Sequence, residues 1–445
     1  MKSLFKEVDN SQLVLFRIVF GILMAFYGVK SMISGWVHHV YILPKFTFNF
    51  IGFDFLQVFV GPQMYIVYTL YSLAALCVAL GYRYRFSIIL FTILWSVVYF
   101  IQKEHYNNHH YLILIVSIIL CFSNAHKWYS LDVKQGRTKA KGTTSNFYIV
   151  LFKLLIAVVF FYAAIAKIYP DWLNAIPMQR WLSFHEYNAV LWSDNFALKL
   201  KSFFSQSRIH YFFSYAGIFF DLLVIPAFLW KRTRTIALVA SLMFHLTNAY
   251  LFKIGIFPFF ALSFVVFFYP AEQIRKLFFK HKPIVHNLKN EFRPSTITTM
   301  FLCTLICFQI VYPLHHHIIP GDVLWTEGGH RHSWRMMLRM KTADCQVFAV
   351  HPIEERYEEI NLSTYLLPCQ IKAMGYRPDF QWQFAKKMEK IYMEKWDIDE
   401  VPISMYAMVG VNGRKKSVFT NKQYDVSSWK WCYFKLPPWL EDKPF

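Results

Sequence analysis

The chain has 445 residues, of which 56% are hydrophobic and 20% aromatic, and its mean hydropathy is +0.30. Soluble domains contain about 45–50% apolar residues, so this composition excludes an ordinary soluble protein and indicates an integral protein of the lipid bilayer. The net charge of +20 falls mainly in short loops between apolar runs, and no nucleic-acid-binding motif accompanies it. Nucleic acid is therefore excluded as a partner.

Nine apolar runs predict a bundle of about nine membrane-spanning helices. The first is over twenty residues long and no small-residue cleavage site follows it, so we expect a retained span rather than a signal peptide. Several later runs are shorter than the roughly 20 residues that an upright span needs, which leaves the count open by one or two. The runs are Ser11–Ile33, Met64–Gly81, Phe86–Gln102, His110–Ser123, Phe147–Lys167, Tyr211–Trp230, Thr235–Phe252, Ile254–Tyr269 and Thr296–Tyr312.

The lysine and arginine content of alternate loops predicts the orientation of this bundle. With the N-terminus in the cytoplasm, the inside loops hold 18 of these residues and the outside loops hold 7. Basic residues concentrate on the cytoplasmic side of membrane proteins, so we expect a cytoplasmic N-terminus. Nine spans then divide the chain into a transmembrane domain, residues 1–312, and an extracytoplasmic domain, residues 313–445.

The last third of the chain changes from apolar runs to the alternating pattern that is typical of strands in a small α+β domain. One amphipathic helical stretch lies near Phe380–Lys395, and Val411-Asn412-Gly413 carries a turn signal. A disulfide is chemically allowed among Cys345, Cys369 and Cys432, but the sequence does not choose among the three pairs. We expect strands at Cys345–Val350, Tyr357–Leu362, Pro402–Val411 and Trp429–Lys435.

Lys167 ends the fifth apolar run and is the most informative single residue. A charged ammonium near the hydrocarbon costs a few kcal/mol or more, so such a lysine usually faces a cavity or a partner and indicates a functional site. The alternative is a lysine at a helix end whose stem lies in lipid while its head reaches the interface. Position alone does not decide between the two.

The predicted topology brings other polar residues to the level of Lys167. The segment Tyr106 to His110, which contains Asn108 and His109, opens the fourth span at that level, and the seventh run carries His245 and Asn248 in its outer half. We expect Lys167, Asn108 and His109 to lie within hydrogen-bonding or one-water distance inside the bundle, with His245 lining the same cavity. A lone histidine such as His245 is, however, more often a satisfied interior group than a catalyst.

Three consecutive histidines, His315 to His317, follow the ninth run and raise the question of a metal. Adjacent histidines on a helix point in different directions, and no carboxylate or cysteine spacing completes a site. We therefore predict no metal.

Five blocks of sequence between about residues 80 and 340 occur in this order in one known family. They are Asn107-Asn108-His109 with Asn124-Ala125-His126; Ala164–Lys167 with Asp171-Trp172; Phe220–Leu223; Phe244-His245 with Asn248 and Ile254–Phe257; and Trp325–Gly328 with Ser333–Met337. In these blocks the chain resembles the vitamin K-dependent gamma-carboxylase family. It is similar to the bacterial members, which share the horizontally transferred transmembrane domain.

The resemblance implies an enzyme of the bacterial inner membrane that oxidises reduced vitamin K, or a menaquinol-like quinol, to its epoxide with O2. The strong base so formed would take a γ-proton from glutamate in a peptide or protein substrate, and the carbanion would capture CO2. Lys167 falls on the family's catalytic base, and His109 with Asn108 on residues that assist it. The candidates for the substrate and quinol pocket are His245, Asn248, Trp325 and Trp334.

The chemistry of Lys167 agrees with that resemblance. Vertebrate members carry a second lysine just before the catalytic one, and Ala166 stands there in this chain. A free lysine is protonated at neutral pH and is no base, but desolvation disfavours the ammonium form. A quinol in the bilayer could reach the amine from the side, and a dry pocket would protect reactive intermediates from bulk protons.

Two alternatives stay open. The first is a quinol epoxidase or oxidase with no protein substrate, which would fix no CO2 into any peptide. The second is a non-enzymatic membrane protein for binding or transport, which predicts a water-connected path across both leaflets. Residues 345–445 match the family's propeptide-binding region too loosely to assign any propeptide contact.

Overall fold

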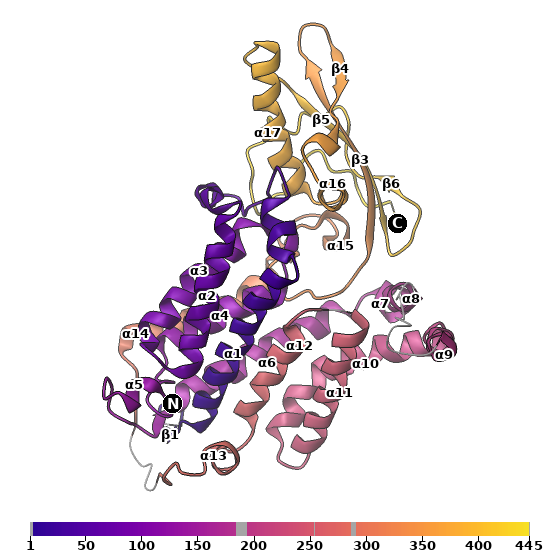
Figure 1. Cartoon of the computed structure of the whole chain (residues 1–445). Coiled ribbons are helices and arrows are strands. Elements are labelled where there is room, and N and C mark those ends of the chain that lie inside the picture. The colour runs from indigo at the N-terminus through magenta and orange to yellow at the C-terminus, as the bar shows by residue number, and fades with distance from the viewer. Residues whose placement is uncertain (1–2, 184–193, 253, 286–290, 445) are drawn as a thin grey trace.

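The computed structural model describes residues 3–183, 194–252, 254–285 and 291–444. A bundle of helices carries an α+β part at one end, as Figure 1 shows. The N-terminus lies near the opposite end of the bundle, where β1 (Glu7–Asp9) and β2 (Thr143–Ser145) pair antiparallel. The prediction of a polytopic helical fold with a C-terminal α+β region is confirmed.

Seven helices in the described part of the chain are long and apolar enough to cross a membrane, and a bent pair would make eight. The bent pair joins α12 (Phe257–Ser263) and η4 (Phe264–Phe268) to α13 (Ala271–Phe278) at 114°. The fourth predicted run forms α4 (Asn108–Phe122), an apolar helix of only 15 residues. The seven are α1 (Ser11–Ile33), α2 (Gln63–Leu80), α3 (Tyr84–Ile101), α6 (Asn146–Ala166), α10 (Ser207–Leu229), α11 (Arg234–Phe252), and α14 (Thr296–Val311) continued by η5 (Tyr312–His317).

Short elements connect these helices and make the protein's turns. On the bundle they are η1 (His38–Ile42), η2 (Asp54–Phe59), η3 (Lys103–His105), α5 (Leu131–Lys134), α7 (Pro170–Leu173), α8 (Ile176–Ser183) and α9 (Asp194–Phe204). Between the bundle and the sheet lies α15 (Val323–Thr326).

Arg17 explains how a charged residue fits inside the first apolar run. Its guanidinium is fully buried and donates to the backbone oxygens of Ala79 at 3.2 Å, Ala125 at 3.1 Å and Tyr129 at 2.7 Å. These carbonyls belong to the end of α2 and to the loop before α5, where helix geometry leaves acceptors without partners. Arg17 therefore fixes the cytoplasm-facing loops of the predicted topology and has no part in the site at the other end.

The C-terminal sheet has four antiparallel strands in the order β4 (Arg356–Glu359), β3 (Lys341–His351), β5 (Ile403–Val411) and β6 (Ser417–Val418). The helices α16 (Pro368–Met374) and α17 (Pro378–Trp396) pack on it, and η6 (Leu362–Thr364) leads into α16. The predicted turn lies between β5 and β6, where Asn412 and Gly413 both have positive φ. The predicted helix and three of the predicted strands fall on these elements.

The fourth predicted strand, Trp429–Lys435, is wrong. This segment is irregular, and its tryptophans pack on α17: the Trp382 indole N–H donates to the Trp429 oxygen at 2.8 Å, and the Trp382 and Trp431 rings lie 5.7 Å apart. Aromatic residues favour strands, but here the helix already covers them, and β6 pairs with the free edge of β5. All seven cysteines are free thiols, so the structure contains no disulfide among Cys345, Cys369 and Cys432.

The two parts of the protein share a core. Phe48, from the loop between α1 and α2, is fully buried among residues of the α+β part and stacks on Phe380 with ring centroids 4.1 Å apart. Beside it, Lys103 and Arg331 both pair with Asp379, at 2.6 and 2.8 Å. The α+β part is therefore fixed firmly on the bundle, with the turn before α4 at the junction.

Candidate active site

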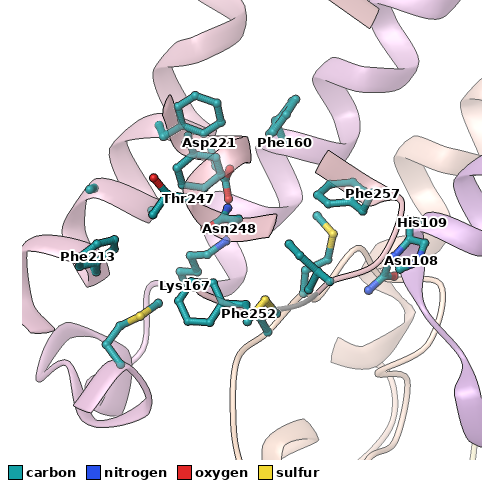
Figure 2. Close-up of a pocket in the computed structure, with 18 of the residues that line it drawn as sticks. Asn108, His109, Phe160, Lys167, Phe213, Asp221, Thr247, Asn248, Phe252 and Phe257 are labelled. Carbon is teal, nitrogen blue, oxygen red and sulfur yellow. The ribbon is translucent and has the colours of Figure 1, made fainter. Parts of the chain in front are cut away.

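A cavity of about 510 Å³ opens between α10, α11, the ends of α4 and α6, and the segment that leads into β3 (Figure 2). Most of its lining is aromatic or aliphatic, with few polar groups. Such a combination of apolar walls and a few convergent polar groups is typical of a small-molecule site. The polar or charged lining residues include Asn107, Asn108, His109, Lys167, Asp221, Thr247, Asn248, His330 and Arg335.

Lys167 is the residue directly after α6, where the chain turns toward Pro170 and α7. Its side chain points into the bundle, and the residue is only 7% exposed. The Nζ atom lies 2.6 Å from Asp221 Oδ2 and donates to the Ala163 oxygen at 3.1 Å. The ring of Trp172 lies 5.5 Å from the same nitrogen. Lys167 is thus a buried, paired residue, and the alternative of a side chain that reaches the lipid interface does not apply.

Asp221 is the partner that the sequence analysis missed. It lies in the middle of α10 and is 5% exposed, so both charges of the pair are removed from water. Buried charges need a partner, because each alone costs several kcal/mol. The signal was present: Asp221 is a carboxylate within an apolar run, and the reasoning applied to Lys167 applies equally to it.

Asn108 and His109 form the first turn of α4 and line the same cavity across from Lys167 (Figure 2). Asn108 Nδ2 donates to the Arg335 oxygen at 3.1 Å, and the His109 ring lies 5.8 Å from that of Phe257. Among the described residues no hydrogen bond joins Lys167 to Asn108 or His109. The structure therefore brings these three residues to one cavity, with open space between them.

The pocket candidates divide into one that lines the cavity and three that do not. Asn248 lines it. His245 is buried behind the wall among aromatic rings such as Phe257, 6.0 Å away, and its Nδ1 has no hydrogen-bond partner within the described chain. Trp334 packs on Tyr111.

Trp325 also lies outside the lining of the cavity. It belongs to the core of the sheet, packs on Phe419 at 5.2 Å, and donates to the Glu441 oxygen. His315 to His317 lie in η5, outside the lining.

The cavity reaches the outer surface of the bundle. Phe212 on α10 and Met243 on α11 both line it, and they are 64% and 67% exposed. This surface is the apolar side of two membrane-crossing helices, so lipid covers it. An apolar molecule dissolved in the bilayer can approach the cavity sideways.

A second cavity of about 220 Å³ adjoins the first on the side of the α+β part and shares Tyr106, His330 and Met337 with it. Its charged lining consists of Arg331, Arg339, Lys341, Arg377 and a single carboxylate, Glu327. We call it the basic cavity.

Glu327 only partly neutralises the basic cavity. Lys341 Nζ lies 2.6 Å from its carboxylate, and Arg339 also pairs with it. Burial alone would raise the pKa of Glu327, but the charges of Arg339 and Lys341 hold that pKa well below its usual range. Glu327 is therefore ionised, and the remaining positive charge favours an anionic ligand.

The sequence matches the HTTM domain over residues 5–272 and the lumenal domain of vitamin K-dependent gamma-carboxylase over residues 294–444. The chain belongs to the vitamin K-dependent gamma-carboxylase family. No solved structure matches it.

In this gamma-carboxylase family member the two matched regions meet at the two cavities. The HTTM region supplies Lys167, Asp221, Asn108 and His109, and the lumenal region supplies the segment from His330 to Lys341. Neither region alone contains a complete cavity. The site is therefore formed only where the two matched regions pack together.

Proposed function

We propose that this protein oxidises a quinol, reduced vitamin K or a menaquinol-like molecule, with O2 and couples that oxidation to carboxylation of glutamate in a peptide. The observation that carries the proposal is the buried Lys167 amine, paired with Asp221 in the wall of an apolar cavity that opens toward lipid. Quinol, O2, CO2 and glutamate would give quinone epoxide, γ-carboxyglutamate and water, which balances atoms and electrons.

Lys167 would act as the base that takes a proton from the quinol hydroxyl. For this the amine must be neutral, and Asp221 at 2.6 Å is placed to accept the lysine's proton. In a dry cavity a neutral pair avoids two buried charges, so this transfer is far less costly there than in water. Asn108 and His109, across the cavity, would donate hydrogen bonds to the oxygen as charge develops on it.

The basic cavity would receive the glutamate side chain. Arg331 is already paired with Asp379, but Arg339, Lys341 and Arg377 still outnumber the one lining carboxylate, Glu327, and so attract an anion. Arginine is well suited to carboxylates because it donates two parallel hydrogen bonds. The product carries one more carboxylate than the substrate, so the same charges also favour it. The wall shared with the quinol cavity would bring the γ-carbon close to the oxidised quinol.

The test is quinone epoxide formation in nanodiscs with a reduced naphthoquinone and O2, scored separately from CO2 incorporation into a glutamate-containing peptide. Lys167→Ala should abolish epoxide formation, and a small neutral amine should partly restore it by supplying a base. Removing Lys167 also leaves the buried Asp221 carboxylate without its partner, which is costly in itself.

Lys167→Arg therefore serves as a second variant. Arginine keeps the positive charge beside Asp221 but is not deprotonated in proteins, so it should fold and form no epoxide. Lys153→Ala is the matched control, since Lys153 lies in α6, the helix that Lys167 follows, over the ring of Phe268 and lines neither cavity. Full epoxide formation by Lys167→Arg would refute the role of the base. Epoxide without carboxylation of any peptide would favour the quinol epoxidase.

A further inference from the structure

Tyr106 lies on the turn between η3 and α4, and it is a lining residue of three cavities of the described chain. Two are the quinol cavity and the basic cavity. The third, of about 20 Å³, lies among aromatic side chains of α1 to α3. Tyr106 thus belongs to the wall that the site proposed for quinol shares with the site proposed for glutamate.

The Tyr106 hydroxyl makes two hydrogen bonds. It donates to Asn108 Oδ1 at 3.0 Å and accepts from the backbone N–H of His332 at 2.8 Å. A backbone N–H can only donate, so the single hydroxyl proton is left for Asn108. At the other end of the same amide, Asn108 Nδ2 donates to the Arg335 oxygen at 3.1 Å. The amide is held from both sides.

An amide held in this way offers the cavity a donor. Nδ2 has two protons, and Arg335 takes one of them, which leaves one for a ligand. A flipped amide would set Oδ1 against the carbonyl of Arg335, two acceptors facing each other. The hydrogen bond from Tyr106 also polarises the amide and strengthens its N–H as a donor.

We propose that Tyr106 is a positioning residue, which fixes the Asn108 amide so that it donates an N–H to a negatively charged oxygen in the cavity. The proposal rests on the proposed function, in which this oxygen belongs to the deprotonated quinol. Lys167 removes the proton from one side of the cavity, and Asn108 stabilises the charge left on oxygen from the other.

Tyr106→Phe keeps the ring and removes the hydroxyl. We expect kcat for epoxide formation to fall about 10-fold with KM for quinol nearly unchanged, because the donor is misplaced rather than lost. Tyr99→Phe is the matched control: its hydroxyl also bonds His332, at Nε2 and 2.7 Å, and its ring lies 6.2 Å from that of Tyr106. It loses a similar buried hydrogen bond without touching Asn108, so its kcat should match wild type.

The Asn108→Ala background separates positioning from a merely structural role. In that background Tyr106→Phe should have no further effect on kcat, because the group that it positions is gone. The same 10-fold loss in both backgrounds would overturn the proposal. Asn108→Asp, which offers only acceptors, should be less active than Asn108→Ala, and wild-type activity in it would also overturn the proposal.

These outcomes differ from a failure of the proposed function, in which wild type forms no epoxide. The melting temperatures of wild type, the two single variants and the double variant then still test the hydrogen bond. Non-additive shifts are expected if Tyr106 holds Asn108, and additive shifts would overturn the inference.

Discussion

At the level of single residues, the pair of Lys167 and Asp221 determines the proton chemistry of the site. Each residue is costly in the membrane by itself. Together they form a contact in which Nζ and Oδ2 lie 2.6 Å apart, close enough for a proton to pass between them. The pair also explains why Lys167 is buried at a helix end, where lysine usually extends to the interface.

Asp221→Asn should lower epoxide formation on the order of 10²-fold, because the amide cannot take the proton of Lys167. It should also lower the melting temperature, since a buried ammonium is left without its carboxylate. The double variant Lys167→Met with Asp221→Leu leaves no buried charge, so it should be inactive yet melt above Asp221→Asn. A double variant that melts below Asp221→Asn would contradict this account.

At the level of elements, the turn before α4 and the start of α17 are joined by buried charges. Asp379, in the first turn of α17, forms ion pairs with Lys103 of η3 and with Arg331 in the wall of the basic cavity. The positions of Tyr106, Asn108 and the basic cavity therefore depend on one carboxylate in the α+β part.

Asp379→Asn should destabilise the protein by about 3–5 kcal/mol, because it leaves the buried Lys103 and the partly buried Arg331 without an anion. Thermal unfolding in detergent measures the effect. Asp344→Asn is the control: it removes an ion pair with Lys416 on a side chain that is 70% exposed, and should change stability by less than about 1 kcal/mol. Equal shifts for the two variants would contradict a special role for Asp379.

The same carboxylate predicts a pH dependence. Burial alone would raise the pKa of Asp379, but the charges of Arg331 and Lys103 outweigh it and lower the pKa to about 2. An unfolded aspartate titrates near about 3.9. The stabilisation is therefore fully present above about pH 4 and is lost as the pH falls through about 2. The gap in melting temperature between wild type and Asp379→Asn should narrow from about pH 6 to about pH 3; a constant gap would contradict the assignment.

At the level of the whole molecule, the orientation in the membrane decides which side supplies the peptide. We propose a cytoplasmic N-terminus and an extracytoplasmic α+β part in the bacterial inner membrane, on the strength of the basic loops at the end of the bundle near β1. A periplasm-dependent reporter after residue 445 should be active, and the same reporter inserted at residue 232, between α10 and α11, should be silent. The reverse pattern would overturn the orientation. The division of the chain into domains between residues 312 and 313 stays a prediction. Phe48, from the first of these domains, packs in the core of the second.

The apolar runs were enough to predict the membrane bundle, because runs near 20 residues have few alternatives in lipid. The sequence also singled out Lys167, Asn108 and His109, since a polar residue in an apolar run needs a reason wherever the chain places it. The tertiary structure alone decided which polar groups meet: Asp221 with Lys167, and Tyr106 with Asn108. It also left His245, Trp325 and Trp334 outside the cavity. Such pairings depend on how helices rotate and pack against one another. Apolar runs specify that packing only weakly, because an apolar side chain is as compatible with lipid as with a neighbouring helix.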